Sequence, residues 1–483
     1  MKRWIMILLL TVILCGCGNQ NTVDETTVSD EGITLWVVTE ETVWDGMNHQ
    51  AKQRIQKFET EHENVAVKLD ILPTDEEERG VYLENLRAQI MAGGGPDAYL
   101  LPTSSVLTLE QPQKYTYVAV EQLFPDVNLA MYNGLFVDIS RYYNIDEALN
   151  KDGLETAAMN AGVIEDARYV LPLRYNIPVI FAHTEALESS GLDVDALASG
   201  ILGLMDAVIA TSDPGWACGA EPMTLFSRTA LSCFSEAIDY KNQEVLLTAQ
   251  ELEEVMESLQ TLEALKGEEN FNLGAWSIGR FIQGEEIWDD YFYSIFVGSL
   301  SDALSAVSIS NALEQDLTMI PLRATDGDLV AHITYYAAVG AGSNYPELAY
   351  EFLRGFLTEE YQWEQNRPEA KEILDVTPGM IESSWPVRSE GAAEHLFSLY
   401  RKYYSNYRTE TEGYQSRRKR ILSTAVTDQL IPVLKEEIDR ARFQIEPEWN
   451  IAIAMGSVTE PNVDIDALAE EIIRELEWHV AEG

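Results

Sequence analysis

The feature that most constrains the fold is an alternation of strand and helix patterns between residues 33 and 101. Residues 33–38 (ITLWVV) form a short apolar run typical of a buried strand, and Val65–Leu72 alternates apolar and polar residues with a strand's period of two. Residues 97–101 (DAYLL) predict a third strand. Apolar residues recur at helical spacing before the second and third strands: Met47, Ala51, Ile55 and Phe58, then Tyr82, Leu83, Leu86, Ile90 and Met91. This order predicts a parallel sheet with helical crossovers, in which ligands gather at the C-terminal ends of the strands.

Three consecutive glycines, Gly93 to Gly95, stand before Pro96. A phosphate-binding loop follows a strand, opens a helix and carries Gly-Lys-Ser/Thr. These glycines instead close a helix and precede a strand, and no such lysine follows them. We therefore expect a helix stop and a tight turn here, not a nucleotide site.

The N-terminus has the pattern of a secretory signal. Lys2 and Arg3 precede a mostly apolar run at residues 4–14, which is too short for the roughly 20 residues of a membrane-spanning helix. The run ends in Leu14-Cys15-Gly16-Cys17, an order that resembles a bacterial lipobox. That resemblance implies cleavage before a lipidated Cys17, so residues 1–17 would be the signal that ends at this cysteine. Residues 18–32 are polar and acidic, as expected of a flexible tether.

Charge and length limit what the rest of the chain does. The sequence has 80 acidic and 33 basic residues, a formal net charge of −47. Such a surface repels nucleic-acid phosphates and anionic bilayers, so membrane association needs the lipid on Cys17. About 450 residues follow the tether, which is typical of two domains. The spacing of Cys218 and Cys233 fits a disulfide and two free thiols equally well.

Five stretches, in order, resemble the extracellular solute-binding proteins of ABC importers, in particular their carbohydrate-binding, maltose-binding-protein-like branch. They are ITLW, FETEHENVAVKLDILPTDEEERGVYLENLRAQIMAGGGPDAYLLP, YVLPLRYNIPVIFAH, LTMIPLRATDGDLVAHITYYAAVGAGSNYPELAYEFLRGFLTEEYQ and SWPVR. The chain departs from the family pattern at residues 109–143 and 289–310.

The resemblance implies an α/β, two-lobed periplasmic-binding-protein fold, with a hinge crossed by several segments and a ligand cleft between the lobes. Lobe one is expected at residues 33–175 plus 331–377, and lobe two at residues 176–330 plus 378–483. The helical stripe of Ile465, Leu468, Ile472, Ile473 and Leu476 predicts a C-terminal helix packed on lobe two.

Candidate ligand contacts lie at strand ends and at the segments that cross between lobes. Those at strand ends are Glu40, Glu41, Trp44, Asp97 and Thr103. Those that the resemblance implies are Arg174 and Asn176 at the first crossing, Tyr335 and Tyr336 at the second, Trp385 in SWPVR and, less directly, Trp276. The competing interpretation is that the tryptophans are core residues and the carboxylates are solvated.

These residue types suit a sugar. Indole and phenol rings cover the apolar faces of a pyranose, while carboxylates, amides and guanidinium groups bind its hydroxyls. The acidic chain favours a neutral oligosaccharide, although Arg174 alone would suffice to hold an anion. Amino sugars, polyols and ligands other than sugars stay open.

The sequence gives less support to an enzymatic function or to nucleic-acid binding. The sequence has no Gly-x-Ser-x-Gly nucleophile elbow, and its six histidines show no metal-ligand spacing. In the basic stretch YRKYYSNYR, Tyr400, Tyr403, Tyr404 and Tyr407 have the spacing of a packed helix face. We therefore expect a lipid-anchored binding protein on the outer side of the cell membrane or in the periplasm, not an enzyme, without cofactor, metal or nucleic acid. Its partners would be a sugar and ABC permease subunits. The alternatives are a surface receptor or sensor with the same fold and a surface-anchored carbohydrate-active enzyme.

Overall fold

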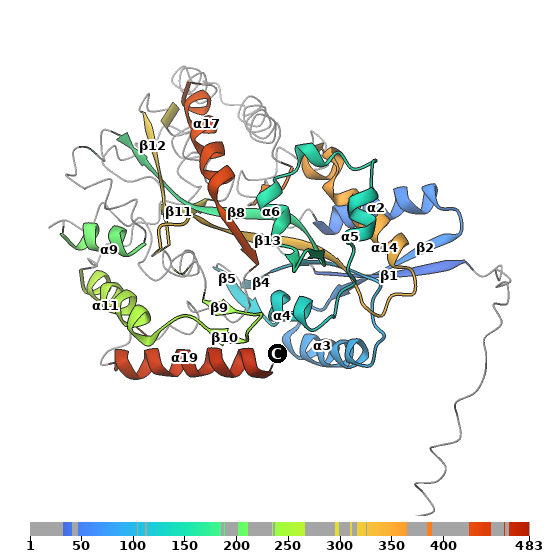
Figure 1. Cartoon of the computed structure of the whole chain (residues 1–483), viewed down its shortest axis with the longest axis horizontal. Coiled ribbons are helices and arrows are strands. Elements are labelled where there is room, and N and C mark those ends of the chain that lie inside the picture. Colours follow the sequence, from blue (N-terminus) through green and yellow to red (C-terminus); the bar gives the residue numbers. More distant parts are fainter. Residues whose placement is uncertain are drawn as a thin grey trace, which may run out of the picture.

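The computed structural model describes residues 32–40, 47–103, 105–111, 114–184, 188, 201–210, 234, 237–265, 295–298, 310–311, 316–324, 326–364, 384–388, 425–445, 458 and 463–482. Figure 1 shows these residues as a mixed α/β molecule whose strands run across its centre. Of the helices in this described part, none is long and apolar enough to cross a membrane.

The predicted strand–helix alternation is confirmed. β1 (Ile33–Glu40) pairs in parallel with β2 (Val65–Leu72) and with β3 (Ala98–Pro102). Between them, α2 (Met47–Glu61) and α3 (Glu76–Met91) make the crossovers. β1 is apolar because most of its residues are buried inside the sheet, whereas β2 lies at the sheet edge and stays partly exposed.

Among the predicted residues whose side chains the structure describes, the two crossover helices bury or partly bury all but one. Ala51 and Phe58 of α2, and Leu83 and Leu86 of α3, belong to the apolar core. Met91 does not, because it is 75% exposed in the last turn of α3. The predicted turn follows directly, where Gly93 and Gly95 adopt φ of 80° and 98°, a left-handed conformation that favours glycine.

Two long strands pass from one half of the sheet to the other. The first half of β8 (Val170–His183) pairs with β13 (Val330–Val339), whereas its second half pairs with β11 (Ile295–Gly298) and β12 (Leu317–Pro321). β13 changes partner in the same region, from β15 (Arg442–Ile445) to β3. The short β14 (Trp385–Pro386) also joins β8 there. We call β8, β13 and β15 the hinge strands.

The remaining elements lie on either side of the hinge strands. Toward β1–β3 these are β4 (Ser105–Gln111), β5 (Lys114–Val120), α4 (Val127–Tyr132), α5 (Ser140–Ile145), η1 (Lys151–Gly153), α6 (Thr156–Asn160), β6 (Val163–Ile164), β7 (Ala167–Arg168), α14 (Pro346–Arg354), η4 (Gly355–Leu357) and η5 (Glu360–Glu364). Toward β11 and β12 these are α9 (Ile201–Ala210), β9 (Ile238–Asp239), β10 (Glu244–Val245), α11 (Ala249–Leu265), α17 (Ala425–Arg440) and α19 (Ile465–Glu482).

The predicted C-terminal helix is confirmed as α19. It packs against α11, which in turn packs against α9, and it buries Ile472 and Leu476. The lobe boundaries predicted between residues 175 and 176 and between 330 and 331 stay predictions. The first falls one residue before the point at which β8 changes partner, and the second falls at the start of β13, in the part that pairs with β15.

Candidate ligand-binding site at the hinge strands

Each hinge strand carries a polar–apolar–polar triplet at the point where the sheet changes partners. The triplets are Arg174-Tyr175-Asn176 in β8, His332-Ile333-Thr334 in β13 and Arg442-Phe443-Gln444 in β15. The strand register aligns the triplets, since His332 is opposite Asn176 on one side and opposite Gln444 on the other. Residues directly opposite each other in a sheet share a face. We call Asn176, His332 and Gln444 the polar hinge row.

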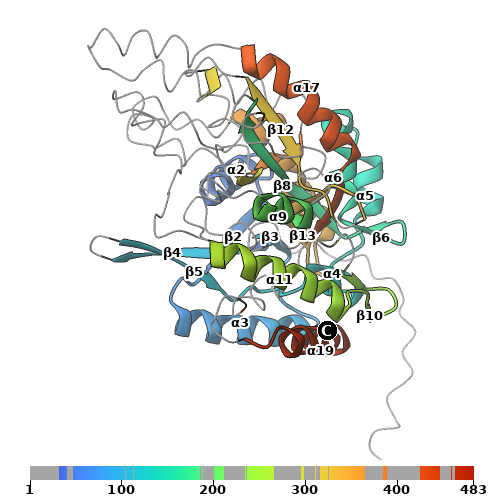
Figure 2. The same ribbon diagram turned by 90° about the vertical axis from the view of Figure 1, so that its left-hand side faces the viewer.

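The other face of the hinge strands is apolar. Tyr175, Ile333 and Phe443 are all buried, and the rings of Tyr175 and Phe443 meet edge to face with centroids 5.0 Å apart. Burial raises the pKa of Tyr175 above its usual value, with smaller contributions from Glu155, at the start of α6, and Asp439 of α17. Successive side chains of a strand point to opposite faces, so the polar hinge row points away from α6 and α17. Figure 2 shows α6 to the right of β8 and β13, and the β4–β5 hairpin to their left.

Two polar atoms on the hinge strands are buried and bond to nothing in the described part of the chain. They are Oδ1 of Asn176 and Oγ1 of Thr334, two residues beyond His332. Buried polar atoms normally have a protein, water or ligand partner, because desolvation without one costs about 1–3 kcal/mol. These two atoms therefore suit a ligand that brings hydroxyl groups.

The structure brings several predicted site residues to this place. Tyr335 is opposite both Pro102 of β3 and Arg174 of β8, and Trp385 is opposite Tyr175. Thr103 closes the junction: its hydroxyl donates to the carbonyl of Ile333 at 2.9 Å, and its N–H donates to the carbonyl of Thr334 at 3.0 Å. Thr103 therefore holds the end of β3 to β13 where β13 turns to its other partner.

The predicted site residues near the hinge strands differ in how exposed their side chains are. Asn176 and Tyr335 are partly exposed, whereas Arg174 is 3% exposed and donates weakly to the carbonyls of Tyr361 and Gln362, both at 3.4 Å. Trp385 is 4% exposed and belongs to the apolar core, as does Tyr336. Among the predicted site residues that the structure describes, Asn176 and Tyr335 are thus the most open to a ligand.

Glu40 and Asp97 have structural partners. Glu40 forms a buried ion pair with Arg79 of α3. Asp97 accepts hydrogen bonds from the backbone N–H of Trp36 at 2.8 Å and from the Ser343 hydroxyl at 2.6 Å. Asp97 precedes β3 while Thr103 follows it, and at about 3.3 Å per residue the two lie roughly 20 Å apart. The structure does not bring Asp97 together with the other candidates.

Other predictions lie outside the described residues. They concern Glu41, Trp44, Trp276, the lipidation site Cys17, the cysteines Cys218 and Cys233, and the tyrosines Tyr400, Tyr403, Tyr404 and Tyr407.

Three residues of the site were missed in the sequence: His332, Thr334 and Gln444. Polar residues alternate with buried apolar ones in VAHIT and RFQI, so a search for period-two patterns points to all three. Their alignment with Asn176 required the strand register, which the sequence does not state.

No metal site is evident in the described part of the chain, where no three His, Cys, Asp or Glu side chains converge. Two described histidines outside the polar hinge row already contact carboxylates, His62 with Glu351 and His479 with Asp126.

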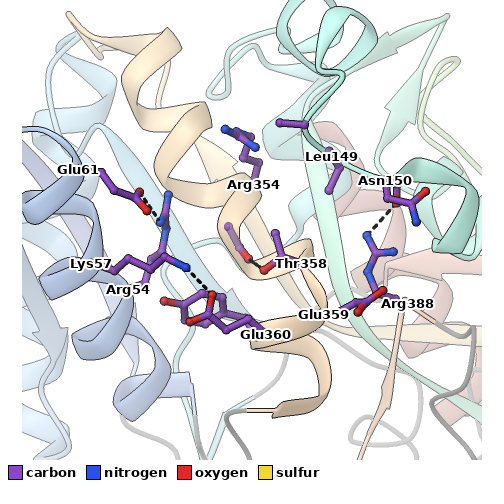
Figure 3. A pocket seen from close by; sticks show the side chains of 13 residues that line it. Arg54, Lys57, Glu61, Leu149, Asn150, Arg354, Thr358, Glu359, Glu360 and Arg388 are labelled. Atoms are coloured by element: carbon purple, nitrogen blue, oxygen red, sulfur yellow. Dashed lines mark hydrogen bonds and ion pairs between the residues drawn. The ribbon is translucent and has the colours of Figure 1, made fainter.

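A hollow of about 370 Å³ lies elsewhere, between α2, α14 and the loop at residues 148–150 (Figure 3). The cations that line it are Arg54, Lys57, Arg354 and Arg388. Each has a partner within the protein, in that order Glu61, Glu360, Asp146 and the carbonyls of Leu357 and Asn150. The hollow shares no residue with the polar hinge row, and its charges hold neighbouring segments together.

Comparison with known proteins identifies the fold. No family model matches the chain, and no curated protein matches it in sequence. The chain is similar to the solved structure of a periplasmic oligogalacturonide binding protein from Yersinia enterocolitica, at 12% identity over 93% of this chain and 99% of that one, with a TM-score of 0.51. The chain has the two-lobed fold of solute-binding proteins.

Two further solved structures are similar at lower TM-scores. One is an extracellular solute-binding protein family 1 protein from Alicyclobacillus acidocaldarius, with 12% identity, 94% and 99% coverage of the two chains and a TM-score of 0.47. The other is the GacH receptor of Streptomyces glaucescens, with 14% identity, 93% and 99% coverage and a TM-score of 0.48.

Proposed function

We propose that this protein is the substrate-binding component of an ABC importer, which captures a sugar or oligosaccharide between its two lobes and delivers it to the permease. The observation that carries this proposal is the polar hinge row. It lies on the strands that connect the two lobes, and its opposite face is a closed apolar core. A ligand there would contact the segments about which the lobes move, as capture by hinge closure requires.

The chemistry of the row suits a polyhydroxylated ligand. The side-chain amides of Asn176 and Gln444 each offer donors and an acceptor, and the Thr334 hydroxyl offers both. Tyr335, partly exposed beside them, supplies a ring that would cover the apolar face of a pyranose. The similar protein from Yersinia enterocolitica binds an oligogalacturonide, according to its name. An oligosaccharide is the ligand class that we propose here, with neutral ones as the first choice.

The rest of the proposal concerns the lobe boundaries, the lipid anchor and the cellular location. We place the lobe boundaries at residues 175/176, 330/331 and 377/378, and the lipid anchor on Cys17, after a tether of residues 18–32. The mature protein would then face the outside of the cell membrane or the periplasm. We propose that the protein binds its ligand without catalysis.

Calorimetry on the lipid-free chain tests the proposal with a panel of neutral and acidic oligosaccharides. For the sugar that binds, Asn176→Ala and Gln444→Ala should each raise Kd roughly three- to thirtyfold, because each removes hydrogen bonds to the ligand. The matched controls Asn85→Ala and Gln89→Ala change the same residue types on the exposed side of α3 and should leave Kd unchanged. Absence of binding across the panel, or equal Kd in all four variants, would contradict this function.

A further inference from the structure

The β4–β5 hairpin is a two-stranded sheet of its own that begins beside the polar hinge row. β4 pairs with β5 in antiparallel register, from Ser105 opposite Val120 to Gln111 opposite Lys114. At about 3.4 Å per residue, its strands are roughly 20 Å long. Figure 2 shows the hairpin projecting to the left of β8 and β13, away from α6 and α17. The polar hinge row points to that same side of the hinge strands.

Hydrogen bonds hold the chain at both ends of the hairpin. β4 begins two residues after Thr103, which is hydrogen-bonded to β13. After β5, two arginines of α3 bind the backbone. Arg79 Nε donates to the carbonyl of Glu121 at 2.6 Å. Arg87 Nε donates to the carbonyl of Leu123 at 3.0 Å. Because one end is bonded to β13 and the other to α3, the base of the hairpin is fixed beside the polar hinge row.

The two faces of the hairpin differ in residue type. Residues opposite each other in antiparallel strands share a face, and neighbours along a strand alternate between the faces. The register therefore gives one face two tyrosines, with a threonine and a glutamate opposite them; these residues are Thr108, Glu110, Tyr115 and Tyr117. The other face is mostly aliphatic, and its central residues are Leu107, Leu109, Thr116 and Val118. We call the first set the tyrosine face.

We propose that the tyrosine face extends the ligand site and binds the outer units of a linear oligosaccharide whose first units lie on the polar hinge row. This inference rests on the proposed function. Phenol rings cover the apolar faces of pyranoses, while the hydroxyl of Thr108 and the carboxylate of Glu110 are suited to bind sugar hydroxyls. Tyr117 and Tyr115 are about 10 and 17 Å from Val120 along β5, so they would meet successive units of a long ligand.

An oligosaccharide is the occupant that continuity with the polar hinge row favours. The hairpin leaves the sheet next to Thr334, whose buried hydroxyl bonds to nothing in the described part of the chain. A sugar that satisfies this hydroxyl would end beside the base of the hairpin, and a longer one would extend along it. Residues 109–120 fall within the region where the sequence departs from the family pattern, so the resemblance assigns them no role. The preferred ligand length would then be a property of this chain.

The test measures how affinity depends on ligand length. Calorimetry on the lipid-free chain uses linear gluco-, manno-, xylo- and galacturono-oligosaccharides, each from the disaccharide to the hexasaccharide. In the series that binds, the wild-type Kd should fall as the ligand lengthens. Tyr115→Ala and Tyr117→Ala should each raise Kd for the hexasaccharide roughly three- to tenfold and leave Kd for the disaccharide unchanged, because only the long ligand reaches the rings. Tyr115→Phe and Tyr117→Phe keep the ring and should stay close to the wild type.

Matched controls separate the tyrosine face from the rest of the chain. Thr116→Ala changes the residue between the two tyrosines, on the other face of the hairpin. Tyr345→Ala removes an exposed tyrosine at the start of α14. Neither should change Kd at any ligand length. Tyr115→Leu and Tyr117→Leu keep apolar bulk without a ring and should behave like the alanine variants, and thermal unfolding checks that each variant is folded.

The outcomes distinguish this inference from the proposed function. A wild-type Kd that does not fall with ligand length would overturn the inference, and so would tyrosine variants that match the wild type or lose the same factor at every length. If Asn176→Ala raises Kd for the disaccharide in those same experiments, the proposed function stands without the hairpin. Absence of binding in every series would overturn both.

Discussion

Arg79 Nη2 lies 2.8 Å from Glu40 Oε1, and both side chains are at least 98% buried. Arg79 belongs to α3 and also donates to the carbonyls of Pro73 and Glu121. Glu40 is the last residue of β1. The ion pair therefore fixes the C-terminal end of a central strand to the helix beside it, and Arg79 also holds the chain where it leaves the β4–β5 hairpin.

Removing one partner of this pair should be costly. Glu40→Gln and Arg79→Met each leave a buried charge without its counterion, so the free energy of unfolding should fall by about 3–5 kcal/mol. The double variant should lose less than the sum of the two single losses, because it leaves no unpaired charge. Urea unfolding measures all three. Glu84→Gln, an exposed residue of α3, is the control, and single losses no larger than its own would contradict the structural role of the pair.

The strand and helix order of the first hundred residues was predictable because its signals are local. A buried strand is an apolar run, a half-exposed strand alternates apolar and polar residues, and an amphipathic helix has a spaced apolar stripe. The predicted alternating strand Val65–Leu72 accordingly matches β2 end to end. Met91 continues the apolar stripe in sequence yet is exposed, because α3 ends there at the glycine turn. Where a helix stops packing against the core depends on the neighbouring elements, which local spacing does not contain.

The candidate site was only partly predictable. Asn176, His332 and Gln444 are more than a hundred residues apart in sequence, and only the strand register places them in one row. Asp97 is the opposite case: it was a candidate because it lies at a strand end, but it opens β3, whereas ligands gather where parallel strands finish.

Anchoring can be tested apart from the fold. Cys17→Ala removes the predicted lipid site, and a chain with a net charge of −47 has no electrostatic attraction to an anionic bilayer. The variant should therefore leave the membrane fraction, as measured by immunoblotting of washed membranes from the producing cells. Cys15→Ala is the control, since it lies within the predicted signal and should leave anchoring intact. Retention of Cys17→Ala in the membranes would rule out a lipid anchor at this residue.

Glu155 should make stability depend on pH. Burial raises the pKa of its carboxyl, the Ala157 N–H opposes that shift, and the Asp439 carboxylate raises it further. The folded protein then holds this proton more tightly than the unfolded chain, so the contribution of Glu155 to stability falls as pH rises through that window above about 4.3. Glu155→Gln should therefore unfold at a higher urea concentration than the wild type at pH 7.

The same comparison at lower pH provides the check on Glu155. At pH 3.5 the wild-type carboxyl is protonated in both states, so the difference between Glu155→Gln and the wild type should shrink toward zero. Glu257→Gln, at an exposed position of α11, should show no such trend. A difference that stays constant from pH 3.5 to pH 7 would mean that titration of Glu155 does not contribute.

Trp385 gives opposite predictions from sequence and from structure. Its Pro-containing surroundings, which resemble the last interlobe segment of the solute-binding family, predict an indole that stacks on a sugar. On that basis Trp385→Ala would weaken binding by roughly 1.5–4 kcal/mol with little change in folding stability. In the structure the indole is 4% exposed, its strand partner is the buried Tyr175, and it belongs to the apolar core. We therefore expect Trp385→Ala to lower the free energy of unfolding by about 3–5 kcal/mol, the usual cost of such a cavity.

Paired measurements on the same samples decide between these two roles of Trp385. Urea unfolding gives the loss of stability, and calorimetry with the sugar that binds gives the loss of affinity. Trp385→Phe should recover part of whichever quantity falls, because a smaller ring still fills some of the space. Trp478→Ala removes an indole that is 64% exposed on α19, and it should change neither quantity by more than about 0.5 kcal/mol. A large loss of affinity at unchanged stability would place Trp385 at the ligand, whereas a large loss of stability with nearly normal affinity would leave recognition to the polar hinge row and Tyr335.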